Sequence, residues 1–365
     1  MMAKIAKGMV ALFCLLLVQA ACESSDLKNS SIPGQNEDML SVGIDSIIDS
    51  ATEDYGPGGA VCVTYRGRVI HRKGYGFADM ERKIPFSPET PCYLASVSKQ
   101  FTCMAIMILK EQGLISYSDS LPEFFEDIPE QWNGITVHHL MTHTSGLPRF
   151  FSLGWDTENI TNEKVFERLK DYEELEFAPG TGYSYCNSGY IFLALIVEKV
   201  TGTPFHLFMR DNVFQPLKMQ QTLVYDKSRP VINGCAVGYA LEENALEIHD
   251  YNLLTMGAGG IYSTVDDLSR WDKGLSEHTL VKKETLQEAF SLHFERSEGE
   301  YYGYGVVISE YERKKRIWHN GELSGFRTHF TRIPEAELSI AVLTNGGWIK
   351  AHEIADSILE LLILP

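Results

Sequence analysis

Apolar residues follow two different spacings along the chain, and these spacings predict where its helices and strands lie. Between 37 and 52 they recur every three or four positions, which predicts an amphipathic helix. Two short apolar runs, 60–65 and 68–71, lie on either side of Gly67 and predict a pair of strands joined by a tight turn. The ordered part of the chain therefore opens with a helix and a strand pair.

The C-terminal part repeats this combination of strands and an amphipathic helix. A helix is expected from 349 to 364, after a series of apolar runs that predict strands at 304–308, 316–319, 327–333 and 338–345. Because strands gather at both ends of the chain, we expect an α/β (α+β) fold. One antiparallel sheet, built from both ends and flanked by helices, would carry a helical subdomain.

The middle of the chain has the pattern of helices. The run 101–109 is apolar on nearly every face and ends before Gly113, which predicts a buried helix. A second apolar helix is expected from 190 to 200, closed by Gly202, and a charged, exposed helix is expected from 162 to 175.

The first residues have the layout of a secretory signal peptide. Lys4 and Lys7 precede an apolar run from 9 to 18, which is too short to span a bilayer comfortably, and small residues follow up to Cys22. We therefore expect residues 1–21 to be removed.

Cys22 follows small residues as the acylated cysteine of bacterial lipoproteins does, although Gln19 stands where that signal usually has Leu. Lipid attachment at Cys22 and ordinary signal-peptide cleavage therefore both stay open. Residues 22–36 are rich in Ser, Asn, Asp and Gly and are expected to form a flexible tether to one domain, 37–365. This organisation predicts an exported bacterial protein, either periplasmic or anchored to the membrane by lipid.

The composition excludes several kinds of partner. With 44% hydrophobic and 22% charged residues, the chain has the make-up of a soluble globular protein. Its 32 basic and 49 acidic residues give a formal charge of −17, which argues against nucleic acid and against charge-driven adhesion to anionic lipid. The spacing of the cysteines after Cys22 fits neither a zinc site nor a disulfide scaffold, so most are expected to be small buried residues: Cys62, Cys92, Cys103, Cys186 and Cys235.

His139 and His143 lie four positions apart on a short helix expected within 135–147, a spacing that can hold a metal ion. However, no glutamate follows His139 as in the zinc-hydrolase motif, and no third ligand is evident. We interpret both as hydrogen-bonded structural histidines. The residues imply no metal and no organic cofactor.

Ser96 and Lys99 stand where the first buried helix begins. A serine at a helix N-terminus meets free N–H groups and the positive end of the helix dipole, which favour developing negative charge. Lys99 lies one turn further on the same face, and a buried lysine can have a lowered pKa and act as a base. The pattern alone is weak, because Ser25 and Lys28 repeat it in a polar segment and an N-cap serine followed by a solvated lysine looks the same.

Two further motifs follow this one, and the three in order are Ser96-Val97-Ser98-Lys99, Tyr185-Cys186-Asn187 and His319-Asn320-Gly321. Together they resemble the serine β-lactamase and penicillin-binding-protein superfamily, and in particular its class C β-lactamase-like serine hydrolases, whose third motif is often His-x-Gly. The likeness covers the chain from about residue 40 to residue 365 and includes the segments 143–147, 177–180, 259–268 and 321–326. It implies a β-lactamase-related catalytic domain over 37–365, with the active site between the sheet and the helical subdomain.

The resemblance also implies a role for each motif residue. Ser96 would be the nucleophile and Lys99 its activator. Tyr185, with a pKa lowered by Lys99, would pass the proton to the leaving group. Asn187 would orient the substrate carbonyl and Lys99, and the N–H groups of Ser96 and Glu322 would bind the oxyanion.

The third motif departs from the Lys-Thr-Gly of the superfamily at His319. A lysine there would offer a permanent cation to a substrate carboxylate, whereas histidine is largely neutral at pH 7. Gly321 would let substrate lie against the strand. The sequence therefore favours an esterase, an amidase or a D-residue peptidase, acting on a small molecule or a peptide, over a penicillinase.

Two other classes of protein fit the sequence less well than this enzyme. A non-catalytic protein that binds penicillin or peptidoglycan fragments, or senses them, would be suggested by loss of Lys99 or Tyr185, and both are present. An α/β-hydrolase is disfavoured because the chain has no Gly-x-Ser-x-Gly motif. The protein is expected to be a monomer.

Overall fold

The computed structural model describes residues 37–52, 56–172, 174–226, 234–243, 245–249 and 254–362. The expected signal peptide (1–21) and tether (22–36), with Cys22, lie outside the described residues. Export, lipid attachment and the domain boundary at residue 37 therefore stay predictions.

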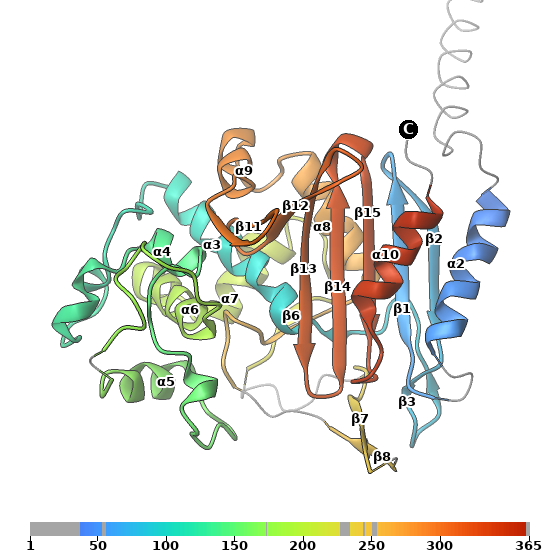
Figure 1. Ribbon diagram of the computed structural model, residues 1–365, viewed down its shortest axis with the longest axis horizontal. Coiled ribbons are helices and arrows are strands. Elements are labelled where there is room, and N and C mark those ends of the chain that lie inside the picture. Colours follow the sequence, from blue (N-terminus) through green and yellow to red (C-terminus); the bar gives the residue numbers. More distant parts are fainter. Residues whose placement is uncertain are drawn as a thin grey trace, which may run out of the picture.

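The centre of the fold is an eight-stranded antiparallel sheet in the order β10-β11-β12-β13-β14-β15-β1-β2. Strands from the two ends of the chain meet where β1 pairs with β15, so the sheet closes across nearly the whole sequence (Figure 1). The strands are β1 (Gly59–Tyr65), β2 (Arg68–Tyr75), β10 (Phe294–Ser297), β11 (Glu300–Tyr302), β12 (Val307–Tyr311), β13 (Lys314–Leu323), β14 (Phe326–Ile333) and β15 (Leu338–Thr344).

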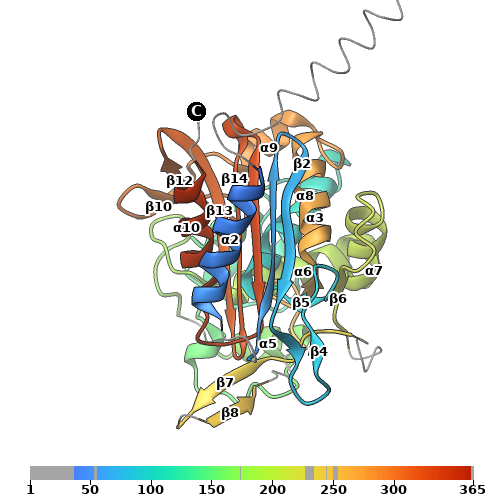
Figure 2. The ribbon, with the colours of Figure 1, turned by 90° about the vertical axis from the view of Figure 1, so that its right-hand side faces the viewer.

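One face of the sheet is covered by the first and last helices of the described chain, α2 (Glu37–Ala51) and α10 (Ala351–Leu361), which lie side by side (Figure 2). Their apolar stripes bury Ile44 and Ile358 against alternate residues of the central strands, such as Val63 and Ile340. This is the packing that the amphipathic patterns predict.

The other face packs against α8 (Val265–Ser276) and the helical part of the chain. At its centre, α3 (Lys99–Glu111) packs on α6 (Asn187–Thr201), and both helices are buried on almost every side. The remaining helices are α4 (Val137–Met141), α5 (Asn162–Leu169), α7 (Phe205–Met209) and α9 (Lys283–Ala289). Short strands complete the fold: β3 (Phe77–Asp79), β4 (Ile84–Pro85), β5 (Cys92–Tyr93), β6 (Leu223–Val224), β7 (Tyr239–Glu242), β8 (Ala245–Ile248) and β9 (Ile261–Ser263).

The predicted architecture is confirmed, with local differences. The helix expected from 162 to 175 ends at Leu169 and is not simply exposed, because Val165 and Phe166 are buried on one face. The strand expected at 304–308 begins at Val307, and the hairpin of β10 and β11 was not predicted. Each of its strands has three or four residues, too few for an alternating pattern to stand out.

The cysteines of the described chain are free thiols: Cys62, Cys92, Cys103 and Cys186 are buried, and Cys235 is partly exposed. This confirms that most are small buried residues. Among the described residues, no single helix is long and apolar enough to cross a membrane. One sharply bent pair, α6 followed by 205–214, passes that test by length and composition, and α6 is a buried core helix.

Asn345, at the end of β15, holds three distant segments together. Its side chain is fully buried, and its Oδ1 accepts the N–H of Gly58 at 2.8 Å. Its Nδ2 lies 3.1, 3.0 and 2.8 Å from the carbonyl oxygens of Phe77, Ala78 and Val237. Because the site is buried, removing the amide would leave these backbone groups without their hydrogen-bond partner.

We therefore expect Asn345→Ala to lower the free energy of unfolding by about 1–3 kcal/mol, the cost of leaving buried polar groups without partners. Urea unfolding followed by circular dichroism measures the change, with the exposed Asn133→Ala as the control. Equal stabilities of the two variants would contradict the role of Asn345.

Candidate active site

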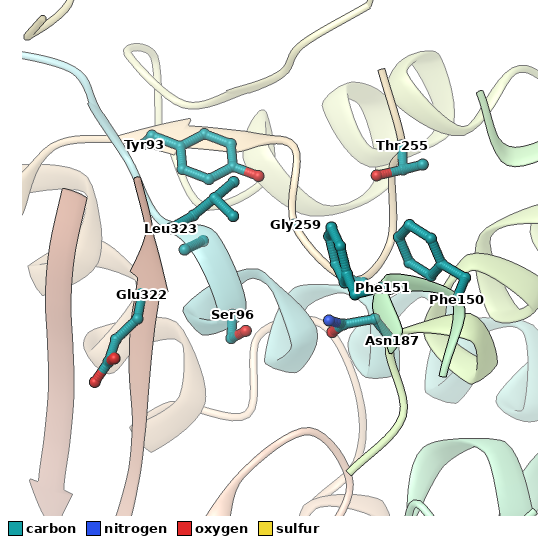
Figure 3. A pocket seen from close by; sticks show the side chains of 11 residues that line it. Tyr93, Ser96, Phe150, Phe151, Asn187, Thr255, Gly259, Glu322 and Leu323 are labelled. Atoms are coloured by element: carbon teal, nitrogen blue, oxygen red, sulfur yellow. The ribbon is translucent and has the colours of Figure 1, made fainter. Parts of the chain in front are cut away.

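Ser96 lies on a one-turn 3₁₀ helix, η1 (Ala95–Ser98), between β5 and the start of α3. The residue before it, Ala95, is buried and has a φ of +48°, a conformation that side chains other than glycine rarely adopt. Such conformations concentrate at functional sites, where the surrounding structure holds them in place. Here the turn presents a partly exposed Ser96 beside β13 and the helical subdomain (Figure 3).

Lys99 is fully buried, and its amino group is surrounded by three oxygen atoms. Its Nζ lies 3.1 Å from Oγ of Ser96, 2.7 Å from Oδ1 of Asn187 and 2.9 Å from the carbonyl oxygen of Ala258. The Asn187 and Ala258 oxygens can only accept hydrogen bonds. A neutral amine therefore satisfies all three contacts when it donates to those two oxygens and accepts the proton of Ser96.

Burial lowers the pKa of Lys99 to about 7, because the ammonium form loses its hydration and finds no carboxylate in return. A substantial fraction of the side chain is then a neutral amine at neutral pH. The sequence predicts such a base beside Ser96, and the structure brings the two residues together.

Tyr185 is also brought to Lys99, but its hydroxyl does not have the expected lowered pKa. The Lys99 Nζ lies over the face of the Tyr185 ring, 4.8 Å from its centre, in a cation–π arrangement. The hydroxyl is buried without a well-formed hydrogen bond, and this burial raises the pKa of Tyr185. The nearby Ser96 hydroxyl lowers that pKa, but by less than burial raises it. The prediction of a lowered pKa was therefore wrong, and Tyr185 is a neutral phenol.

His143 forms two hydrogen bonds with the segment that carries Tyr185 and Asn187. Its Nδ1 accepts the N–H of Cys186 at 3.0 Å, and its carbonyl oxygen accepts the N–H of Ser184 at 3.0 Å. This confirms a hydrogen-bonded structural histidine. His139 likewise accepts the N–H of Thr136 on Nδ1, at 3.2 Å. Within the described ranges, no group of three His, Cys, Asp or Glu side chains could hold a metal ion.

His319 is buried and has both ring nitrogens engaged. Its Nδ1 lies 2.6 Å from the Asn320 carbonyl oxygen and must donate, so Nε2 accepts the Tyr302 hydroxyl at 3.0 Å. Burial and the nearby Lys99 lower the pKa of His319 to about 3. The third motif therefore supplies a neutral imidazole, in line with the sequence analysis.

Gly321 has a packing role that was not predicted from the sequence. A β-carbon there would lie 2.1 Å from both the Leu94 carbonyl oxygen and the Thr328 Oγ1. The missing side chain thus lets β13 pack against the turn that bears Ser96. Contact of substrate with this strand stays a prediction. Glu322 follows on the other face of the strand, is exposed and borders the space around Ser96.

Two hollows meet at Ser96, Asn187 and Glu322. The first is aromatic: Phe150 and Phe151 lie on the Asn187 side of Ser96, opposite Glu322 (Figure 3). The second, of about 430 Å³, is more polar and is lined by Tyr183, Tyr185, Arg296, Ser297, Val307, Trp318, His319 and Asn320.

Neither the aromatic pair nor Arg296 was predicted from the sequence. Phe150 and Phe151 lie in a stretch without helical or strand periodicity, and Arg296 lies on the unpredicted β10–β11 hairpin. No motif marks these residues, although two adjacent aromatic residues in a loop are a signal that could have been followed.

The Ser96 hydroxyl lies beside a buried, partly neutral lysine, and a tyrosine and an asparagine are close to that lysine. This arrangement defines an acyl-transferring serine hydrolase site. The Beta-lactamase family model matches residues 44–361. The chain therefore belongs to this family of serine hydrolases and is a hydrolytic enzyme of the β-lactamase-related type.

Individual relatives of the chain are named penicillin-binding protein or D-aminopeptidase. The chain is 30% identical to "Penicillin-binding protein 4*" of Bacillus subtilis over 323 residues, which is 83% of this chain and 71% of the relative. It is 28% identical to a "D-aminopeptidase" of Gluconobacter oxydans over 83% of this chain but only 58% of the relative. The structure is similar to the octameric penicillin-binding protein homologue of Pyrococcus abyssi, with a TM-score of 0.81 and 28% identity over 90% of this chain and 78% of the other.

If neutral Lys99 activates Ser96, the reaction of Ser96 with a fluorophosphonate should accelerate as the pH rises. The rate should climb about tenfold per pH unit at low pH and level off above about 7, because the amine accepts a proton only when it is neutral. The measurement is the second-order labelling rate between pH 5 and 9.

Variants of the same helix provide the controls. Lys99→Met should slow labelling by about 10²–10⁴-fold, a typical contribution of a general base. Lys110→Met, which changes a lysine on the surface end of α3, should keep the wild-type profile. A flat profile in the wild type would contradict the role of Lys99.

Proposed function

We propose that this protein hydrolyses amide or ester bonds through an acyl-enzyme on Ser96. The observation that carries the proposal is the fully buried Lys99 amine, 3.1 Å from the Ser96 hydroxyl and with a pKa close to neutrality. A merely structural lysine in this position would be expected to have a carboxylate partner, and its hydrogen-bond partners are instead neutral oxygens.

In the acylation step, the Lys99 amine takes the proton of Ser96 as Oγ attacks the substrate carbonyl carbon. The N–H groups of Ser96 and Glu322 stabilise the oxyanion of the tetrahedral intermediate. Tyr185 then donates its hydroxyl proton to the leaving nitrogen or oxygen and recovers a proton from the Lys99 ammonium.

Deacylation runs the same proton transfers in the opposite direction. Water attacks the acyl-enzyme, gives up a proton to the Lys99–Tyr185 pair, and the Ser96 oxygen leaves as the hydroxyl. A neutral Tyr185 suits the donor role, because a phenol whose pKa is raised by burial keeps its proton until the leaving group needs it.

The substrate proposed is an amide or ester of a D-amino acid or short peptide. Relatives named D-aminopeptidase and penicillin-binding protein support this class. The neutral His319 supports it over penicillinase activity, because the third motif offers no cation to a β-lactam carboxylate. A penicillin-binding or sensing protein without turnover is the second candidate, supported by the name of the Bacillus relative.

Labelling distinguishes the two candidates. We expect a fluorescent fluorophosphonate to label the purified protein, Ser96→Ala to abolish the label, and Ser98→Ala to keep it, because the Ser98 hydroxyl is buried and makes no hydrogen bond. Intact mass should show one adduct.

A fluorescent penicillin that forms a stable adduct on Ser96, without turnover of peptides or esters, would favour the sensor. No labelling by either probe would refute the serine-enzyme proposal.

Tyr185→Phe tests the proton donor. Hydrolysis of a p-nitrophenyl ester, whose leaving group departs without a proton, should fall less than hydrolysis of the matching amide, whose nitrogen must be protonated. We expect about 10²–10⁴-fold loss of kcat for the amide, compared by steady-state kinetics with the same acyl group. Equal losses on both substrates would assign Tyr185 a structural role only.

A further inference from the structure

A buried arginine, Arg332, lies between two hollows at the end of the sheet where β13 begins and β14 ends, beside α8 and α9 (Figure 1, upper end). The α8 hollow has a volume of about 460 Å³ and the α9 hollow about 530 Å³, both within the range of small-molecule sites. Arg332 and Ser276 line both hollows. Their described lining residues are all different from those of the hollows at Ser96, so this is a separate place in the fold.

The guanidinium of Arg332 is poorly bonded for a buried charge. Only 7% of its side chain is exposed. Its Nη2 donates to Oγ of Ser276 at 2.8 Å, and this is its one hydrogen bond within the described part of the chain. Nε lies 2.9 Å from Oδ1 of Asp272, but neither atom has a hydrogen-bond partner in a suitable direction. Because buried charges need their donors bonded, the guanidinium has N–H groups to offer to a ligand.

The carboxylate of Asp272 balances this charge on one side only. Asp272 lines the α8 hollow and does not line the α9 hollow, whereas Arg332 lines both. The rim of the α9 hollow carries exposed lysine and glutamate side chains of both signs: Lys283, Lys315, Glu335 and Glu337. Their charges offset one another and are screened by solvent. The buried Arg332 is therefore the charge that a ligand in the α9 hollow would meet.

The wall of the α9 hollow beside Arg332 is apolar. Ile317 on β13 is the cross-strand partner of Arg332, so the two side chains lie next to each other on one face of the sheet. Leu275 and Leu286, which are buried, and the half-buried Phe290 extend this wall. A cation with free donors thus stands at one side of an apolar hollow, which suits a ligand with an anionic head and an apolar body.

We infer that the α9 hollow binds a free carboxylic acid with an apolar chain, with its carboxylate on Arg332 and its chain against Ile317, Leu286 and Phe290. A guanidinium can form two parallel hydrogen bonds to a carboxylate, and these would use donors that have no partner within the described residues. The site is independent of the chemistry at Ser96 and does not rest on the proposed function.

The test is binding of dodecanoate to the purified protein, measured by isothermal titration calorimetry. The wild type should bind dodecanoate at a single site. Dodecan-1-ol and dodecyltrimethylammonium have a similar apolar chain without the anion, and each should bind about tenfold or more weakly, because neither can form the charged hydrogen bonds.

Two substitutions remove the head-group contact or fill the hollow. Arg332→Gln should weaken dodecanoate binding by about 10- to 100-fold, the usual cost of losing a charged hydrogen bond. Gln287→Trp, an exposed position of α9 that lines only the α9 hollow of the pair, should weaken it by about tenfold or more, because the indole takes the space of the chain. Gln131→Trp, exposed and away from both hollows, should bind as the wild type does.

Asp272→Asn makes the opposite change. It removes the carboxylate that competes for the guanidinium, so dodecanoate should bind about two- to fivefold more tightly. Thermal unfolding checks that each variant is folded. If Arg332→Gln does not fold, Asp272→Asn and Gln287→Trp decide the question, since both keep the arginine.

Several results would overturn the inference. These are a wild type that does not bind dodecanoate or binds dodecan-1-ol equally well, and unchanged binding in Gln287→Trp or in a folded Arg332→Gln. Unchanged or weaker binding in Asp272→Asn would refute the role of Arg332. Loss of fluorophosphonate labelling at Ser96 would contradict the proposed function alone and would leave this binding site unaffected.

Discussion

The active site depends on the burial of one amino group. Lys99 lies at the start of α3 in the middle of the core, and its Nζ has only neutral oxygens within hydrogen-bond distance. A lysine paired with a carboxylate would stay protonated and could not accept a proton from Ser96. The cost of burying the amine without a counter-ion is therefore what makes it a base, and the surrounding helices must be stable enough to bear that cost.

The arrangement holds because both ends of the chain contribute to it. The strands β13 and β14 come from the C-terminal part, and the Ser96 turn comes from the first third of the sequence. They approach so closely that position 321 cannot carry a β-carbon, and Thr328 donates its hydroxyl to the Leu94 carbonyl at 2.8 Å. The position of the nucleophile relative to β13 is thus set by backbone packing across the domain, and not by the flexible rotamers of the site residues.

Much of this could be predicted from the sequence because the relevant signals are local. Amphipathic spacing predicted the terminal helices, and the sequence motifs identified Ser96 and Lys99 with their neighbours Tyr185 and Asn187. The direction in which the pKa of Tyr185 is shifted could not be predicted from the sequence. It depends on burial of the hydroxyl by distant segments and on the position of the Lys99 Nζ over the face of the ring. Arg296 was hidden for a different reason, since only the pairing of β11 with β12 brings its short hairpin to the site.

The neutral His319 helps Lys99 to act as a base. A lysine at position 319 would place a second buried cation near Lys99, and each charge would make the other harder to maintain. An imidazole held between Tyr302 and the Asn320 carbonyl avoids this, because both of its nitrogens are satisfied without a charge. The permanent charge nearby, the Arg296 guanidinium, lies at the partly exposed rim of the site and keeps its hydration. A neutral imidazole at position 319 therefore lets Lys99 titrate near neutrality.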